Sequence, residues 1–295
     1  MRADISLHYD GPIAKDHRLS LRVVGGAFDN LQGAIDRAVL DVKYGSVWKN
    51  ARLKRTDYPL AEFDITGFRE GGFIADLKQA AGGMGPEVLN RIRSALVPGY
   101  EAALRDADEI YSSLTEQAQL RKRTLDTGAI QVKEFSTFLE SADEEISGRF
   151  GDRSILKEFD QLLTPIRAKA NEGSTLEISI TTDRPLTLSF DALKSKSFHR
   201  VVSRRRVGNP LLIEVLVRSL DQGNEFQGAK GKLKNLQTKR DFILHIADEY
   251  SFNSLLPFLV KGKRQQKVRI VASPVLEYES FDPYGGDMFF LGLGK

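Results

Sequence analysis

The spacing of apolar residues changes near residue 170, and this change constrains the fold more than any other feature of the sequence. Between residues 86 and 170, apolar side chains recur every three to four positions, as at Leu89, Ile92 and Leu96. That spacing places them on one face of a helix. From residue 171 onward they alternate with polar residues in short segments, which is the period of a strand. Segregated helical and strand-rich regions predict an α+β protein.

The first 80 residues predict a strand, a helix and a β-hairpin, in that order. Residues 4–9 alternate as a strand does, and Asp16 is placed to cap a helix that ends at Gly45. Segments 62–68 and 72–79 predict a hairpin. The helical region that follows predicts a hairpin of helices or a small bundle, broken at Pro98-Gly99 and interrupted at Gly128 and Gly148–Gly151.

The last 85 or so residues predict a small barrel of the SH3 or OB type, with one short helix at 252–260. The expected strands are 212–218, 231–236, 242–247, 268–272 and 288–293. We therefore predict two domains. Residues 1–170 form an α+β domain with a helical insertion, and residues 171–295 form a β-rich domain that contains the barrel. A length of 295 residues suits two domains.

Composition excludes several classes of protein. The chain has no cysteine, so it has no disulfide, thiolate zinc site or cysteine nucleophile. No stretch approaches the roughly 18 consecutive apolar residues of a membrane span, and the N-terminus lacks the apolar core of a signal peptide. We expect a cytoplasmic protein without a membrane partner.

A resemblance rests on two short motifs in the first 80 residues. Asp16-His17-Arg18-Leu19 opens an apolar helix, and Glu70-Gly71-Gly72-Phe73 lies in the predicted hairpin. This pattern resembles a loosely defined set of uncharacterised bacterial proteins that have a helix start of the HR-hydrophobic type, a GSF-type hairpin and a small C-terminal β-domain. The chain departs from it at Gly72, where a small polar residue is usual. The resemblance implies a fold and a bacterial origin but no activity.

One arrangement predicts metal-dependent chemistry. Asp64 on one strand, followed by Asp76 and Lys78 on the next, is the layout of restriction-endonuclease-like nucleases, in which acids hold Mg²⁺ and a lysine activates water. Asp76 and Lys78 fall on one strand face. The same alternation is typical of the solvent face of a half-buried hairpin, which is the interpretation we favour. The nuclease alternative implies Mg²⁺ as a cofactor, and the favoured interpretation implies none.

A second polar cluster surrounds the first turn. His8, Asp10, Asp16 and His17 lie close in sequence and offer ligands for a divalent ion. The competing interpretation is that Asp16 caps a helix and that His8 lies on the polar face of a strand. The latter is favoured.

The most useful functional signal is positive charge. Residues 171–295 contain 19 of the 43 Lys and Arg residues and 14 of the 40 Asp and Glu residues, a net charge of +5. The remaining 24 basic and 26 acidic residues give residues 1–170 a net charge of −2. The basic C-terminal residues form three groups: Arg204, Arg205 and Arg206; Lys230, Lys232 and Lys234; and Lys263 and Arg264. The three lysines at period two project to one side of a strand. Clustered cations of this kind bind phosphates, although lysines also protect the edges of sheets.

Three aromatic residues accompany these groups. Phe198, Phe226 and Phe242 offer stacking faces if they are exposed, and are core residues otherwise. From these features we predict a non-enzymatic accessory or recognition protein that binds a protein partner or a nucleic acid through its C-terminal half. The sequence is compatible with a homo-oligomer and does not indicate the oligomeric state. A role in phage defence is compatible with the resemblance, but no residue indicates it.

Overall fold

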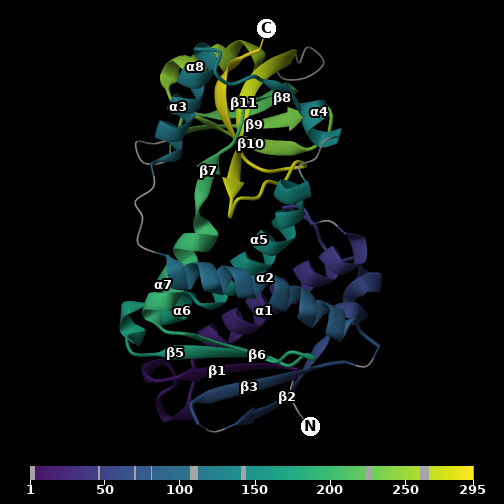
Figure 1. Cartoon of the computed structure of the whole chain (residues 1–295), viewed down its shortest axis with the longest axis vertical. Coiled ribbons are helices and arrows are strands. Elements are labelled where there is room, and N and C mark those ends of the chain that lie inside the picture. The colour runs from purple at the N-terminus through teal and green to yellow at the C-terminus, as the bar shows by residue number, and fades with distance from the viewer. Residues whose placement is uncertain are drawn as a thin grey trace. The chain divides into compact units, whose positions relative to one another are not determined.

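The computed structural model describes residues 4–45, 47–69, 71–80, 82–106, 112–140, 144–223, 228–259 and 266–294, with the backbone alone for 144–149. The chain forms two compact units whose segments interleave. Unit 1 comprises residues 1–47, 51–109 and 151–203, and unit 2 comprises residues 48–50, 110–150 and 204–295. Both units mix helices and strands, which confirms the α+β class (Figure 1).

Unit 1 is built on a five-stranded antiparallel sheet with the order β2-β3-β1-β5-β6. Its strands are β1 (Ile5–Asp10), β2 (Phe63–Arg69), β3 (Phe73–Gln79), β5 (Thr175–Ile180) and β6 (Leu186–Phe190). Alternate residues of β1 and β5 are buried, because one face of the sheet is covered by helices (Figure 1). The helices on that side of the sheet are α1 (Leu21–Tyr44), α2 (Gly85–Arg105), α7 (Ala192–Ser203) and the later part of α5 (Glu144–Leu162), which packs on α1 and α2.

Helix α1 starts later than the sequence predicts. The Ser20 hydroxyl caps it by accepting a hydrogen bond from the Val23 N–H (3.3 Å). Asp16 instead lies in the preceding turn, with a positive φ of 55°. The prediction of Gly45 as the end of the helix is correct, since Gly45 adopts the left-handed conformation there.

Helix α2 continues through Pro98, where the sequence predicts a break. Tertiary packing explains the difference. Gly99 lies against the side chains of Leu156 and Phe198, and an added Cβ would come within 2.8 Å of Leu156 Cδ2. Close contact of α2 with its neighbours therefore favours the helix at a position where its local sequence disfavours it.

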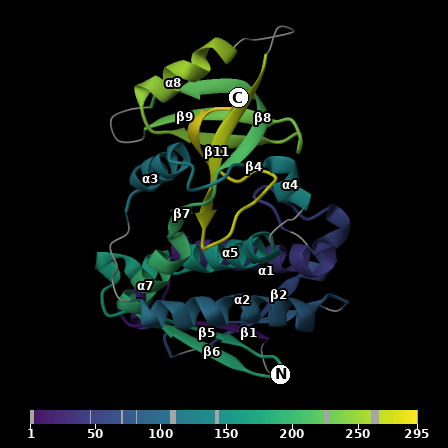
Figure 2. The same cartoon turned by 45° about the horizontal axis from the view of Figure 1, so that its top comes forward.

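Unit 2 contains a closed five-stranded barrel, so the prediction of a small C-terminal barrel is confirmed. Its strands are β8 (Leu211–Asp221), β9 (Ala229–Asn235), β10 (Asp241–Ile246), β11 (Lys267–Glu277) and β12 (Met288–Leu293). They follow the order β8-β9-β10-β12-β11, and β11 closes the barrel by pairing with β8. The β10–β12 pair is parallel and the other barrel pairs are antiparallel. Figure 2 shows the barrel strands with helix α8 (Glu249–Leu255) beside them.

Short elements complete the two units. In unit 2, β4 (Lys133–Glu134) pairs with β8 and β7 (Arg205–Val207) pairs with β11, and the helices are α3 (Leu114–Asp126), α4 (Phe135–Glu140) and η4 (Leu256–Phe258). In unit 1 the remaining helices are η1 (Pro12–His17), η2 (Arg55–Ala61), α6 (Thr164–Arg167) and η3 (Lys169–Asn171). Among the described residues, no helix is long and apolar enough to cross a membrane.

The two units differ from the predicted division into 1–170 and 171–295. Strand β5 belongs to the sheet of unit 1, because six of its residues pair with β1. In the middle of the chain, α3 and α4 belong to unit 2, where Phe135 lies in the barrel core. The predicted bundle of helices is therefore divided between the units, because partners distant in sequence decide where each helix packs.

Candidate functional site

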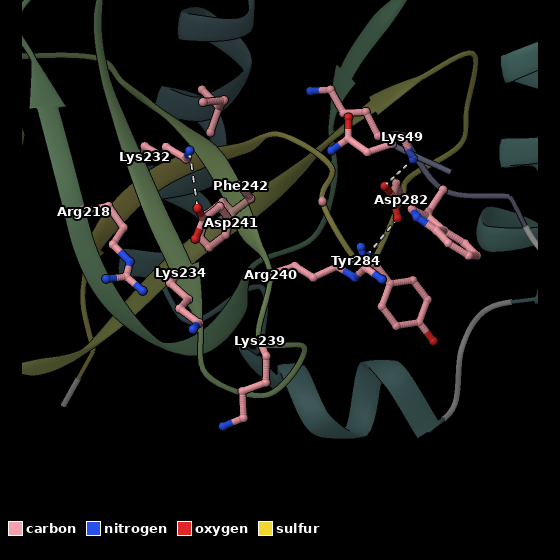
Figure 3. A pocket seen from close by; sticks show the side chains of 14 residues that line it. Lys49, Arg218, Lys232, Lys234, Lys239, Arg240, Asp241, Phe242, Asp282 and Tyr284 are labelled. Carbon is pink, nitrogen blue, oxygen red and sulfur yellow. Dashed lines mark hydrogen bonds and ion pairs between the residues drawn. The ribbon is translucent and has the colours of Figure 1, made fainter. Parts of the chain in front are cut away.

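Unit 2 has a cavity of about 510 Å³ on the outside of its barrel (Figure 3). Four chain segments line it: strand β8, the β9–β10 hairpin, the loop between β11 and β12, and the short segment 48–50. The lining residues are Trp48, Lys49, Asn50, Arg218, Lys232, Lys234, Lys239, Arg240, Asp241, Phe242, Ile243, Asp282, Tyr284 and Gly285. Six of these carry positive charge and two carry negative charge, so the lining has a formal charge of +4.

The basic side of the cavity follows from the alternation of strand β9. Gly231, Leu233 and Asn235 are buried, so Lys232 and Lys234 lie on the outer face. Figure 3 shows these two lysines close to Arg218. The ammonium of Lys232 lies 3.4 Å from Asp241 Oδ2, an exposed pair that neutralises only part of the charge.

The β9–β10 turn adds two more cations. The buried side-chain oxygen of Asn235 accepts hydrogen bonds from the N–H groups of Gln237 (2.8 Å) and Thr238 (3.2 Å), which shapes the turn. Lys239 follows with a φ of 60°, a left-handed conformation that lysine seldom adopts. Arg240 completes the turn and also lines the cavity.

A buried carboxylate organises the opposite side. Asp282 is 2% exposed and accepts hydrogen bonds from the N–H groups of Lys49 and Tyr284, both at 2.8 Å. Figure 3 shows both bonds. Burial raises the pKa of Asp282, while these two bonds act in the opposite direction. Asp282 thereby joins segment 48–50 to the β11–β12 loop.

Asp287 fixes the side chain of Lys49. The Lys49 ammonium donates to Asp287 Oδ1 (2.7 Å), and His245 Nε2 lies 3.3 Å from Asp287 Oδ2. Burial acts to raise the pKa of Asp287, but the bonds from His245 and Lys49 outweigh it and hold that pKa at about 2. The carboxylate therefore stays ionised at neutral pH and anchors one wall of the cavity.

The lining contains three aromatic residues, Trp48, Phe242 and Tyr284; Phe242 is buried, so Trp48 and Tyr284 are the rings that remain partly exposed. The Arg240 guanidinium lies 5.4 Å from the centre of the Trp48 ring, a cation–π contact. Tyr284 is 46% exposed. Sequence patterns missed both rings, since neither lies in a periodic segment; the turn-forming run 282–286 and the single tryptophan of the chain were the available signals.

The structure brings together only part of the predicted basic surface. Lys232 and Lys234 line the cavity, whereas Lys230 lies on the same outer face of β9 but outside the lining. Lys263 and Arg264 lie outside the described residues.

Arg204, Arg205 and Arg206 do not belong to the cavity lining. Arg205 forms an ion pair with Glu277 (2.6 Å), and Arg206 forms one with Glu279 (3.0 Å). Strand β7 pairs with β11, which brings these acids beside the arginines. Neighbouring carboxylates therefore offset much of the charge of this arginine group.

The predicted aromatic faces are core residues where the structure describes them. Phe198 is fully buried, and Phe242 is 6% exposed. Phe226 lies outside the described residues.

The predicted nuclease residues lie on the β2–β3 hairpin of unit 1. Asp64 on β2 is directly opposite Lys78 on β3, so these two side chains share one face of the hairpin, as the nuclease layout requires. Asp76, however, accepts two hydrogen bonds from Arg69 (2.5 and 2.9 Å), and these lower its pKa. A shallow cavity of about 320 Å³ on this face includes Asp76 but neither Asp64 nor Lys78. The arrangement fits a polar sheet face better than a metal site.

The polar cluster at the first turn holds the neighbouring hairpin. His8 Nε2 lies 2.6 Å from the Gly71 carbonyl oxygen, and His17 Nδ1 accepts a hydrogen bond from the Gly72 N–H (3.2 Å). Over the described part of the chain, no group of three or more His, Asp or Glu side chains is placed to hold a metal ion.

Comparison of the chain with protein-family models, with curated proteins and with solved structures found no match. The resemblance to uncharacterised bacterial proteins therefore stays an expectation from the sequence.

Proposed function

We propose that this is a non-enzymatic recognition protein that binds nucleic acid through the basic cavity of unit 2. The observation that carries the proposal is the convergence of six cations and an exposed aromatic ring on one cavity. Cations supply affinity for the phosphate backbone, and rings supply stacking surfaces for bases. A protein partner with an acidic surface is the competing ligand, and it would not need the ring.

The topology of the barrel supports the same function. We propose that the barrel is of the OB type, because the helix α8 lies between its third and fourth strands and the third strand runs parallel to the fifth. Barrels of this type bind oligonucleotides on the face of strands two and three and on the loop between strands four and five. The corresponding elements here are β9, β10 and the β11–β12 loop, which line the cavity.

A salt titration with fluorescently labelled oligonucleotides tests this function. With about four phosphates neutralised, the logarithm of the affinity for a single strand is expected to fall with the logarithm of salt concentration with a slope of about −3. The affinity should therefore drop by roughly 50-fold between about 50 and 200 mM salt. Absence of binding at the lowest salt would contradict the proposal.

The same titration in the presence of Mg²⁺ distinguishes a nucleic-acid-binding protein from a metal-dependent nuclease. We expect no strand cleavage, because the Asp76 carboxylate is paired with Arg69. Cleavage that depends on Mg²⁺ and is lost in Asp76→Asn would instead support the nuclease.

Lys239→Gly provides a separate prediction for the turn. Glycine adopts a positive φ without steric cost, so the free energy of unfolding should stay unchanged or rise by up to about 1 kcal/mol. Affinity for an oligonucleotide should nevertheless fall by about threefold to tenfold, because one cation is lost from the cavity. Thermal unfolding and the binding titration measure the two effects. Unchanged affinity would show that Lys239 does not contact the ligand.

A further inference from the structure

We infer that the cavity of unit 2 selects single-stranded nucleic acid, with one base stacked on Tyr284 and the adjoining phosphates on the lysines of β9. This inference rests on the proposed function and specifies its ligand. It follows from the way in which the two sides of the cavity differ in chemistry.

Tyr284 presents its ring on a fixed loop. Its N–H donates to Asp282 Oδ1, and the Gly286 N–H donates to the Asp282 carbonyl oxygen (2.8 Å). The residue is 46% exposed. Within the described residues, no aromatic ring or cation stacks on it. A held backbone with an open ring is a preorganised stacking surface, since little entropy is lost when a base packs on it.

Three of the six cations lie on the other side, at the barrel strands, whereas Lys49 and Arg240 lie on the side of Tyr284. Figure 3 shows Arg218, Lys232 and Lys234 at the barrel strands, and Tyr284 beside Asp282 near Lys49. A nucleotide extends from a flat apolar base to a charged phosphate, so its two ends match the two sides of the cavity.

The cavity suits an unpaired nucleotide. Its volume of about 510 Å³ falls within the roughly 300–1,000 Å³ of pockets that enclose small ligands. In a duplex each base face is covered by its neighbours, so stacking on Tyr284 would first require a base to leave the stack. Single strands present their base faces without that cost.

The single tryptophan of the chain offers a direct measurement of the binding. Trp48 lines the cavity beside Arg240, so its fluorescence should change when a base enters. The probes are a single-stranded DNA of about 12 nucleotides, the same sequence as RNA, and the DNA duplex; this length lies within the range of about 4–16 nucleotides for one such barrel. We expect either single strand to change the Trp48 emission and to bind at least about tenfold more tightly than the duplex.

Variants of tyrosine test the stacking step. Tyr284→Ala is expected to weaken single-strand binding by about tenfold or more, whereas Tyr284→Phe, which keeps the ring, should bind within about twofold of the original protein. Tyr250→Ala is the matched control, because Tyr250 is 81% exposed on α8 and does not line the cavity. The Asp282 bond uses the Tyr284 backbone, so truncation of the side chain leaves the loop anchored.

Two outcomes would overturn the inference, and only one of them would also overturn the proposed function. Equal affinity for single strand and duplex, with no loss in Tyr284→Ala, would overturn stacking but leave salt-dependent nucleic-acid binding intact. Absence of binding by any probe at low salt would overturn both the inference and the proposed function.

Discussion

Changing Lys232 and Lys234 together to glutamate is expected to weaken oligonucleotide binding by about 100-fold or more at physiological salt. Each substitution removes a cation and adds an anion, a change of two charges beside the phosphates. At about 1 kcal/mol per charge pair in water, four charge changes amount to roughly 3–4 kcal/mol, and each 1.4 kcal/mol is tenfold in affinity. The slope of affinity against salt should also decrease by about 1.4, because two phosphate contacts are lost.

The matched control is the same charge reversal at Arg205 and Arg206. Both side chains are exposed and cationic, but they pair with Glu277 and Glu279 and do not line the cavity. We expect this variant to retain affinity within a few fold. If it loses as much as the lysine variant, the arginine group is part of the binding surface and the cavity alone does not explain recognition. Circular dichroism of both variants checks that the barrel remains folded.

A large loss of stability is expected in unit 1 from Arg91→Met. The Arg91 side chain on α2 donates to Asp41 on α1 and forms an ion pair with Asp152 on α5, both at 2.6 Å. Gly151 leaves no room for a Cβ beside this cluster. The three side chains are only 17–33% exposed, so removal of the arginine leaves two partly buried carboxylates without the cation that both contact. We expect the free energy of unfolding of unit 1 to fall by about 3 kcal/mol.

Urea denaturation followed by circular dichroism measures this loss. Arg105→Met is the control on the same helix, because Arg105 forms an exposed pair with Glu101 at 3.6 Å. Such a pair contributes less than about 0.5 kcal/mol. Similar small losses in both variants would show that the Arg91 cluster does not hold the three helices together.

Local patterns predicted the elements of unit 2 well. The alternation of apolar residues located all five barrel strands, because a strand with one buried face has to repeat every second residue. The same alternation placed Lys232 and Lys234 on the outer face, which the structure confirms. Two of the cations that line the cavity were therefore identified from the sequence.

Local patterns were less informative about helices and domain boundaries. Pro98 predicted a break in a helix that packing against Leu156 and Phe198 keeps continuous. The change of period near residue 170 suggested a domain boundary. Strand β5, which follows that boundary, nevertheless pairs with β1 near the start of the chain, about 170 residues earlier in the sequence. Periodicity reports which face of a segment is buried and does not report which distant segment covers it.

The amino-acid sequence by itself determined the α+β class, the barrel strands and the outward lysines of β9, because each depends on residues within a few positions of one another. Only the tertiary structure decided which cations act together. It brought Trp48 and Lys49 to the barrel through Asp282, placed Tyr284 opposite Lys232 and Lys234, and paired Arg205 with Glu277. The physical reason is that the set of charges and rings around one ligand site depends on contacts between segments far apart in the chain, which a local pattern does not record.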